Sequence, residues 1–371
     1  MKTMGIYIHI PFCNSKCAYC DFVSAVRTDD EKAEYFNRLK EDISEFSRNE
    51  ATNDRVVDSI YIGGGTPSCV DAGYIADTLG ALRSAFDVSA NAEISIEANP
   101  ESLTAQKAKA YAAAGVNRIS MGLQAASDEL LAAIGRRHTV ADFVRAADIA
   151  QSLFPEVSAD MMLGLPGQTV RDCERTVKLI AGRGFTHVSA YALKVEEDTP
   201  LAASGYVPDA DYSAELYDRV SEMLRDFGFE WYEVSNFAVP GHECRHNLRY
   251  WRRGEYLGFG VSAHSFFNDE RFAVTSDFNA YLAGEGVTER RYIPPDGEEA
   301  AEETIMLALR TREGLDLKKF TADFGRDLLS ERKDQAELLK EGGYIETDGE
   351  RLRLTEKGLY VMNDIIVRLA M

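Results

Sequence analysis

The chain has 371 residues, of which 45% are hydrophobic and 10% aromatic, and its formal net charge at pH 7 is -20. This apolar content can fill one large domain and a smaller one, and no run approaches the roughly 18 apolar residues of a membrane span. The negative charge argues against a nucleic-acid partner, because phosphate binding requires a surplus of Lys and Arg. The short apolar N-terminal stretch has no cleavage-site pattern, so we expect a cytoplasmic protein.

Up to about residue 193, short β-branched or aromatic runs alternate with longer segments of helical periodicity, as in a series of βαβ units. Strands are predicted at 5–10, 56–62, 92–98, 117–122, 157–163 and 187–192. Helices are predicted at 31–47, 71–85, 104–114, 127–133, 140–153 and 169–182. This order predicts an α/β fold, either most of a (β/α) barrel that is open on one side or a doubly wound sheet. In both folds the chemistry lies at the C-terminal ends of the strands.

Three cysteines follow the first predicted strand in the stretch PFCNSKCAYCDF, where Cys13, Cys17 and Cys20 have the spacing C-x3-C-x2-C. In a reducing compartment such a group indicates metal ligands sooner than disulfides. Structural zinc usually takes four protein ligands, and nothing nearby supplies the fourth. Three thiolates on a cluster of four irons would leave one iron open to an exogenous ligand. Incidental cysteines, or zinc with a distant His, are the alternatives.

Polar or glycine-rich groups also follow the other predicted strands. The run GGGTP at 63–67 follows the second strand, Glu97 lies at the end of the third, Gln124 follows the fourth, and Asp160 lies in the fifth. Each has an ordinary explanation alone, since Gly and Pro punctuate turns and strands often end in polar residues. Their coincidence at one edge of the predicted sheet indicates a single functional site.

Beyond residue 193 the pattern is less regular. We predict a helix at 211–227, a strand at 229–234, a loop rich in His, Cys and aromatic residues at 240–256, and a Gly-rich apolar run at 257–267. We interpret 194–293 as a bridging region that covers the barrel mouth. His242, Cys244 and His246 alternate in the predicted loop and would lie on one side of an extended segment, so a zinc or iron site is one option there.

After Pro294 and Pro295 a new unit is predicted over 294–371. Helices are expected at 298–310, 316–325 and 329–341, then a hairpin that turns at Asp348 and Gly349, and a final helix. This order is typical of a small winged-helix-like α+β domain. Asp and Glu outnumber Lys and Arg in it, so its surface would repel phosphate, and a packing or partner role is expected.

The cysteine spacing, with the aromatic Tyr19 directly before the last cysteine, resembles the signature of the radical S-adenosylmethionine (SAM) superfamily. The resemblance implies a partial (β/α)6 TIM-like barrel over 1–193, a 4Fe-4S cluster on the three cysteines, and SAM bound at the open iron. The GGGTP run is similar to the GGTP element of that family, where backbone without Cβ approaches the methionine ammonium closely. Resemblance to the coproporphyrinogen-oxidase-like branch implies SAM contacts at Tyr7, Tyr19, Gly64, Gly65, Thr66, Glu97, Gln124, Arg136, Asp160, Met162 and Ala192.

Two stretches distinguish the members of this branch. Oxygen-independent coproporphyrinogen III oxidases carry a further Cys two positions after the third, whereas this chain has Phe22, as HemW-type heme chaperones do. The stretch HNLRYW at 246–251 also resembles the HNxxYW motif of these chaperones. The resemblance implies that His246 ligates heme iron and that Asn247, Tyr250 and Trp251 surround the macrocycle. A loop that packs its aromatic residues and satisfies its histidine locally is the other interpretation.

We therefore predict a heme chaperone with a 4Fe-4S cluster and SAM, and the alternative is an oxidase that decarboxylates the propionates of coproporphyrinogen III. The predicted partners are heme, a heme-acceptor protein and a reductant for the cluster. Contact with a membrane is expected only through the acceptor. No residue is assigned a catalytic role from the sequence.

Overall fold

The computed structural model describes residues 1–370 of the chain. One sheet of 12 strands runs through residues 2–292 in the order β12-β11-β10-β9-β1-β2-β3-β4-β5-β6-β8-β7. The strands are β1 Lys2–Ile10, β2 Arg55–Gly64, β3 Val88–Ala98, β4 Arg118–Gln124, β5 Glu156–Leu163, β6 His187–Ala192, β7 Glu230–Glu233, β8 Asn236–Ala238, β9 Tyr256–Phe259, β10 His264–Phe267, β11 Glu270–Val274 and β12 Val287–Tyr292.

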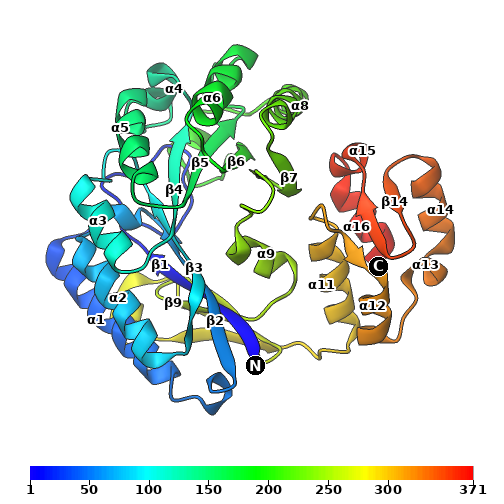
Figure 1. The fold of residues 1–371 in the computed structure, drawn as a ribbon, viewed down its shortest axis with the longest axis horizontal. Helices are drawn as coiled ribbons and strands as arrows, with labels where there is room; N and C mark the ends of the chain where they lie inside the picture. The colour runs from blue at the N-terminus through cyan, green and yellow to red at the C-terminus, as the bar shows by residue number, and fades with distance from the viewer. Residues whose placement is uncertain (371) are drawn as a thin grey trace.

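The six central strands β1 to β6 are parallel neighbours, and a helical segment follows each of the first five. These helices lie along the outer side of the curved sheet (Figure 1). They are α1 Asp29–Phe46, α2 Ala72–Ala85, α3 Ala105–Ala113, α4 Asp128–Ala133, α5 Val140–Gln151 and α6 Val170–Gly182. The sheet does not close on itself, so the predicted partial (β/α) barrel, open on one side, is confirmed.

Local sequence explains where these elements begin. Strand β1 is buried over most of its length, as expected for a parallel strand that is covered on both faces. Helices α1, α5 and α6 each start with a capping box, in which Thr28, Thr139 and Thr169 accept from the third helical residue and its carboxylate reaches back. The N-caps fix where these helices begin. The loops that join the parallel strands to the following helices therefore lie together at one edge of the sheet.

Residues 194–293 extend the sheet at both edges. Strand β9 pairs in parallel with β1 and leads into the antiparallel strands β10 to β12, while β8 and β7 follow β6 at the other edge. The remaining helical segments of this part of the chain are η1 Glu50–Thr52, η2 Pro67–Cys69, α7 Pro200–Ala203, α8 Ala210–Asp226, α9 Arg245–Trp251 and α10 Phe278–Leu282. Helix α9 packs against β2 and lies between the sheet and the C-terminal part of the chain (Figure 1). The prediction of a loop at 240–256 is therefore wrong over residues 245–251, which form α9.

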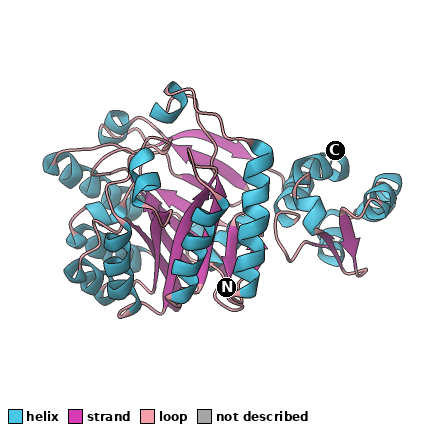
Figure 2. Ribbon diagram, turned by 90° about the horizontal axis from the view of Figure 1, so that it is seen from above, coloured by secondary structure: helices cyan, strands magenta, loops and turns pink. Residues whose placement is uncertain are grey.

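The C-terminal residues form a second hydrophobic core, which includes Ile305, Phe320, Leu352 and Ile365. Its elements are α11 Glu298–Ala308, β13 Leu315–Asp316, α12 Leu317–Phe324, α13 Leu328–Glu331, α14 Lys333–Glu341, β14 Ile345–Thr347, β15 Arg351–Leu354, α15 Glu356–Leu359 and α16 Met362–Ala370. This unit stands beside the barrel (Figure 2). Its helices and hairpin have the predicted winged-helix-like order, although two predicted helices are each split in two. None of the helices in residues 1–370 is long and apolar enough to cross a bilayer.

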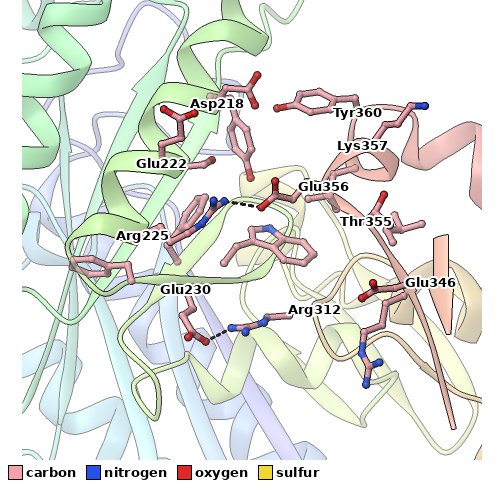
Figure 3. A pocket seen from close by; sticks show the side chains of 18 residues that line it. Asp218, Glu222, Arg225, Glu230, Arg312, Glu346, Thr355, Glu356, Lys357 and Tyr360 are labelled. Carbon is pink, nitrogen blue, oxygen red and sulfur yellow. Dashed lines mark hydrogen bonds and ion pairs between the residues drawn. The ribbon is translucent and has the colours of Figure 1, made fainter. Parts of the chain in front are cut away.

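Backbone hydrogen bonds attach this C-terminal unit to the barrel. The Val234 N–H donates to the Arg310 carbonyl at 3.2 Å, and the Arg312 N–H donates to the Tyr232 carbonyl at 3.0 Å, so this segment covers the edge strand β7. A cavity of about 750 Å³ lies beside this junction, and the ion pairs Arg225–Glu356 and Arg312–Glu230 bridge its walls (Figure 3). None of the predicted site residues lines this cavity.

Candidate functional site

The three cysteines lie in residues 11–27, which we call the cysteine loop, directly after β1. The two ends of the loop are joined by the Cys13 N–H, which donates to the Ala25 carbonyl at 3.1 Å. Its middle is held from two other elements, since the Ala18 N–H donates to the Ile134 carbonyl at 3.0 Å and the Leu201 N–H donates to the Ala18 carbonyl at 2.8 Å. Backbone contacts from three parts of the chain therefore define the shape of the loop.

Cys13, Cys17 and Cys20 are half-buried free thiols. Arg136 donates from Nη1 to Cys17 Sγ at 3.7 Å, and Thr66 Oγ1 lies 3.5 Å from Cys13 Sγ. Within residues 1–370, no three Cys, His, Asp or Glu side chains are close enough to share a single metal ion. This arrangement does not suit zinc, whereas a cubane binds each thiolate through a different iron and does not require the thiols to meet at one point. The donor set fits an iron-sulfur cluster with one open iron.

The glycine run at the end of β2 lies against the cysteine loop. The Gly65 N–H donates to the Ile10 carbonyl at 2.9 Å, and the Thr66 N–H donates to the Phe12 carbonyl at 2.7 Å. A Cβ at Gly65 would lie 2.6 Å from the Phe12 carbonyl oxygen, and a Cβ at Gly63 would lie 3.0 Å from the Glu97 carboxylate. Glycine is therefore required here by close contacts of the chain with itself.

Two carboxylates face each other across the interior of the barrel. Glu97 accepts from the Tyr61 hydroxyl at 3.0 Å and from the Gly64 N–H at 3.1 Å, while Asp160 accepts from the Ser120 hydroxyl at 3.0 Å. Burial, and then the charge of Asp160, raise the pKa of Glu97 to about 7. Burial raises the pKa of Asp160 to about 6. Both groups would gain from a ligand that brings hydrogen-bond donors or positive charge.

Arg136 supplies the complementary charge from the loop after β4 and α4. Its Nη2 donates to Asn99 Oδ1 at 2.8 Å and to the Gly122 carbonyl at 2.7 Å, whereas its Nε is buried without a hydrogen-bond partner. An unpaired buried donor is costly unless a ligand satisfies it. Gln124 stands nearby with a φ of 70°, at a register shift in the β4–β5 pairing. Left-handed backbone in a non-glycine residue is typical of functional sites.

The aromatic and apolar site residues come from four parts of the chain. Met162 belongs to a small buried cluster at the strand ends, and Tyr19 of the cysteine loop packs against that cluster. The Tyr7 hydroxyl lies 3.1 Å from His9 Nδ1, and His9 Nε2 donates to the Val23 carbonyl at 2.9 Å, which leaves Nδ1 as the acceptor. Ala192 lies at the end of β6, where it pairs with Leu163, the residue after Met162, and it also lines a cavity of about 780 Å³ between β6 and α8.

The HNxxYW stretch forms helix α9, and its histidine is enclosed. His246 is 0% exposed, its Nδ1 lies 3.0 Å from the Ser59 hydroxyl, and its Nε2 lies 2.8 Å from the Tyr250 hydroxyl. The ring stacks on Tyr61 with a centroid distance of 5.4 Å. Burial lowers the pKa of His246 to about 3, so the ring is neutral. Both nitrogens of His246 are hydrogen-bonded and the ring is enclosed, which favours the local structural interpretation, and heme ligation by His246 stays a prediction.

The other face of α9 points toward β7, where Asn247 and Trp251 lie near the buried Glu233. Residues four apart share a helix face, so His246 and Tyr250 face β2 while Asn247 and Trp251 face Glu233. Trp251 is half-buried beside Glu233, and its contact with the macrocycle stays a prediction. The motif holds α9 in the open side of the barrel.

The prediction of a metal site at His242, Cys244 and His246 is wrong. His242 Nδ1 lies 2.9 Å from the Glu156 carboxylate, and Cys244 Sγ lies 3.5 Å from Glu93. The predicted alternation failed because α9 begins at residue 245 and turns the third side chain away.

We expect His246→Ala to lower the free energy of unfolding by about 2–4 kcal/mol, because it leaves a cavity and removes the hydrogen-bond partner of two buried hydroxyls. Denaturant unfolding of the anaerobic protein measures this loss. His242→Ala is the matched control, since its half-exposed ion pair should contribute at most about 1 kcal/mol. Unchanged stability of the His246 variant, together with loss of a heme signal, would restore the ligand interpretation.

Tyr61 and Asn99 belong to the site but were not predicted. Strand periodicity could have indicated Tyr61, because residues 61 and 63 share one face of β2 and the last of these opens the GGGTP run. Asn99 gave no comparable signal. Its contact with Arg136 joins the ends of two different loops.

The chain matches known families over most of its length. Residues 7–180 match the radical SAM superfamily, and residues 296–361 match the HemN C-terminal domain. The chain is 33% identical over 369 residues to the heme chaperone HemW of Bacillus subtilis, with 97% of each chain covered. It is 34% identical over 378 residues to the heme chaperone HemW of Mycobacterium tuberculosis, with 99% of this chain and 94% of the relative covered.

A mitochondrial protein and a solved structure are also similar. The bovine radical S-adenosyl methionine domain-containing protein 1 is 34% identical over 388 residues, with 98% of this chain and 87% of the relative covered. The structure of coproporphyrinogen III oxidase HemN from Escherichia coli matches with a TM-score of 0.87 and 22% identity, covering 100% of this chain and 90% of that chain. At this identity the structural match shows a common fold.

Proposed function

Since the chain belongs to the HemW family of radical SAM proteins, we propose that it binds heme as cargo and passes it to an acceptor protein. The observation that carries this proposal is identity of 33–34% to curated heme chaperones over nearly the whole of both chains. Phe22 supports it, because the oxidases of the same superfamily carry a cysteine at that place.

The family implies a 4Fe-4S cluster and SAM as cofactors. Cys13, Cys17 and Cys20 would hold the cluster, and Glu97, Arg136 and Asp160 would hold SAM through their unsatisfied charges. When bound, the cluster can supply an electron to the sulfonium of SAM. The chain itself contributes orientation and the exclusion of water, through the buried carboxylates and the loop contacts described above.

SAM affinity is expected to fall about tenfold between pH 8 and pH 6, because the pKa of Glu97 is raised to about 7 and only the ionised carboxylate is a strong acceptor. Lowering the pH through 7 protonates Glu97 and weakens binding, while Asp160, with a pKa of about 6, is mostly ionised at pH 7 and titrates only as the pH approaches 6. Anaerobic calorimetric titration of the reconstituted protein at several pH values measures the effect.

Glu97→Gln is the control for this pH dependence. The amide keeps the size of the side chain and does not titrate, so the slope of affinity against pH should disappear near pH 7. A Glu97→Gln variant with the unmodified pH profile would show that another group controls SAM binding.

The proposed function is tested by titrating the anaerobically reconstituted protein with heme and then adding apo-cytochrome as an acceptor. We expect a stoichiometric heme complex with a Soret band and transfer of heme to the acceptor. Coproporphyrinogen III is supplied in a parallel reaction with SAM and reductant, and we expect no vinyl product. Conversion of coproporphyrinogen III without heme binding would replace the chaperone proposal with the oxidase.

The finer points of the proposal concern partners and location. A reductant is needed if the cluster is to change oxidation state, and a membrane is reached only through the heme acceptor. Six free cysteines suit a reducing compartment, so we place the protein in the cytoplasm.

A further inference from the structure

An open cavity of about 480 Å³ lies between the cysteine loop and β9–β10. Its walls include Tyr7 of β1, Phe22 of the cysteine loop, Tyr250 of α9 and His264 at the start of β10. Tyr256 adds a further ring, with its centroid 4.6 Å from that of Tyr250 in an edge-to-face contact. The cavity is therefore lined by aromatic side chains and by two imidazoles, the buried His9 and the exposed His264.

The histidines of the chain differ in their freedom to bind a metal. The rings of His9, His138, His187 and His246 are buried and hydrogen-bonded within the protein. His242 is partly exposed but is paired with Glu156 at the start of β5, at the opposite edge of the sheet from the cysteine loop. His264 alone is exposed, lines a cavity, and has no hydrogen-bond partner for either ring nitrogen within residues 1–370.

We propose that His264 is the axial ligand of the heme cargo and that the macrocycle lies in this cavity, with one face toward Phe22. The inference rests on the proposed function, because it identifies where that cargo binds. A neutral imidazole with a free nitrogen is the usual protein ligand of heme iron, and aromatic rings provide the flat apolar contact that a porphyrin needs.

Two features of the cavity support this assignment independently. Phe22 is 67% exposed, so its ring is available at the rim and has no apolar partner within the protein that would bury it. Ser262, which also lines the cavity, has a φ of 60°, and such backbone in a non-glycine residue is concentrated at ligand sites.

The charges and the size of the cavity orient the cargo. Asp21 is exposed on the wall next to Phe22, and it would repel a propionate, so the propionates should point away from the cysteine loop. Because the cavity is open and has a volume of about 480 Å³, part of the macrocycle would remain accessible. An acceptor protein could therefore take hold of the heme before His264 releases it.

The test compares hemin binding by unmodified protein, His264→Ala and the control His242→Ala, all anaerobically reconstituted. We expect the His264→Ala variant to lose at least tenfold in hemin affinity and to show altered ferric heme absorption and EPR spectra, while its iron-sulfur signal and stability stay unchanged. His242→Ala should behave as the unmodified protein. In His264→Gly, added imidazole should restore the original heme spectra, because the free base can occupy the vacated position.

Two further outcomes separate this inference from the proposed function. Phe22→Ala should weaken hemin binding and keep the axial-ligand spectrum, since it removes contact area and not the iron ligand. If the unmodified protein binds hemin and His264→Ala has the same affinity and spectra, the ligand assignment is overturned and the chaperone proposal stands. If the unmodified protein binds no hemin, both are overturned.

Discussion

Cys17→Ala is expected to abolish the iron-sulfur cluster. Two thiolates do not hold a cubane firmly, so after anaerobic reconstitution we expect iron and sulfide to fall below about a tenth of the content of the unmodified protein. Cys17 is also the cysteine that Arg136 contacts, so its loss removes the direct link between the cysteine loop and the predicted SAM site. Chemical determination of iron and acid-labile sulfide measures the change.

Cys69→Ala is the matched control, because Cys69 is a half-buried free thiol on η2, just after the glycine run and outside the cysteine loop. This variant should keep its full cluster content. Circular dichroism of both variants shows whether the barrel is folded. Full iron in the Cys17 variant, or equal loss in both variants, would mean that the ligand set differs from Cys13, Cys17 and Cys20.

Gly64→Val is expected to lower the free energy of unfolding by about 3–5 kcal/mol, because it combines backbone strain with overpacking. Gly64 has a φ of 114°, and a Cβ there would lie 2.7 Å from the His9 ring. Displacing that ring would break its hydrogen bond to the Val23 carbonyl in the cysteine loop. We also expect SAM affinity to fall, since the Gly64 N–H positions the Glu97 carboxylate.

The denaturant unfolding of the Gly64→Val variant is compared with that of the Gly80→Ala variant. Gly80 lies exposed in the middle of α2, and a Cβ there would meet no atom within 4 Å. Alanine should therefore stabilise the helix by about 0.5–1 kcal/mol. The opposite signs of these two glycine substitutions distinguish a positional requirement from a general effect of adding a side chain. Equal unfolding midpoints for Gly64→Val and the unmodified protein would contradict the claim that position 64 requires glycine.

The parallel part of the fold was predictable because its signals are local. Strand β6 was predicted with its observed bounds, and α6 begins where Thr169 and Asp172 form a capping box. The cysteine spacing and the polar residues at the strand ends could also be recognised from the sequence. Their common location was predictable because parallel strands bring their carboxyl ends to one edge of the sheet.

The region around α9 was not predictable for the opposite reason. Helix α9 has only seven residues, too few for a clear periodicity, and its first N–H groups are satisfied by Glu93 on β3. That carboxylate is distant in the sequence, so no local pattern indicates the helix. The role proposed for His264 could not be predicted from the sequence either. Within residues 1–370 its lack of hydrogen-bond partners stands out only when the partners of every other histidine are known.

The position of Ala18 between Ile134 and Leu201 has a consequence for how the protein is made. During synthesis, the cysteine loop leaves the ribosome long before these two partners do. At about 5–20 residues per second, the interval between residues 18 and 201 is about 10–40 s. Until then the cysteine loop lacks two of the backbone contacts that define its shape. We therefore expect iron and sulfide to be inserted after α7 has been translated, which would make cluster loading a late event in the maturation of the chain.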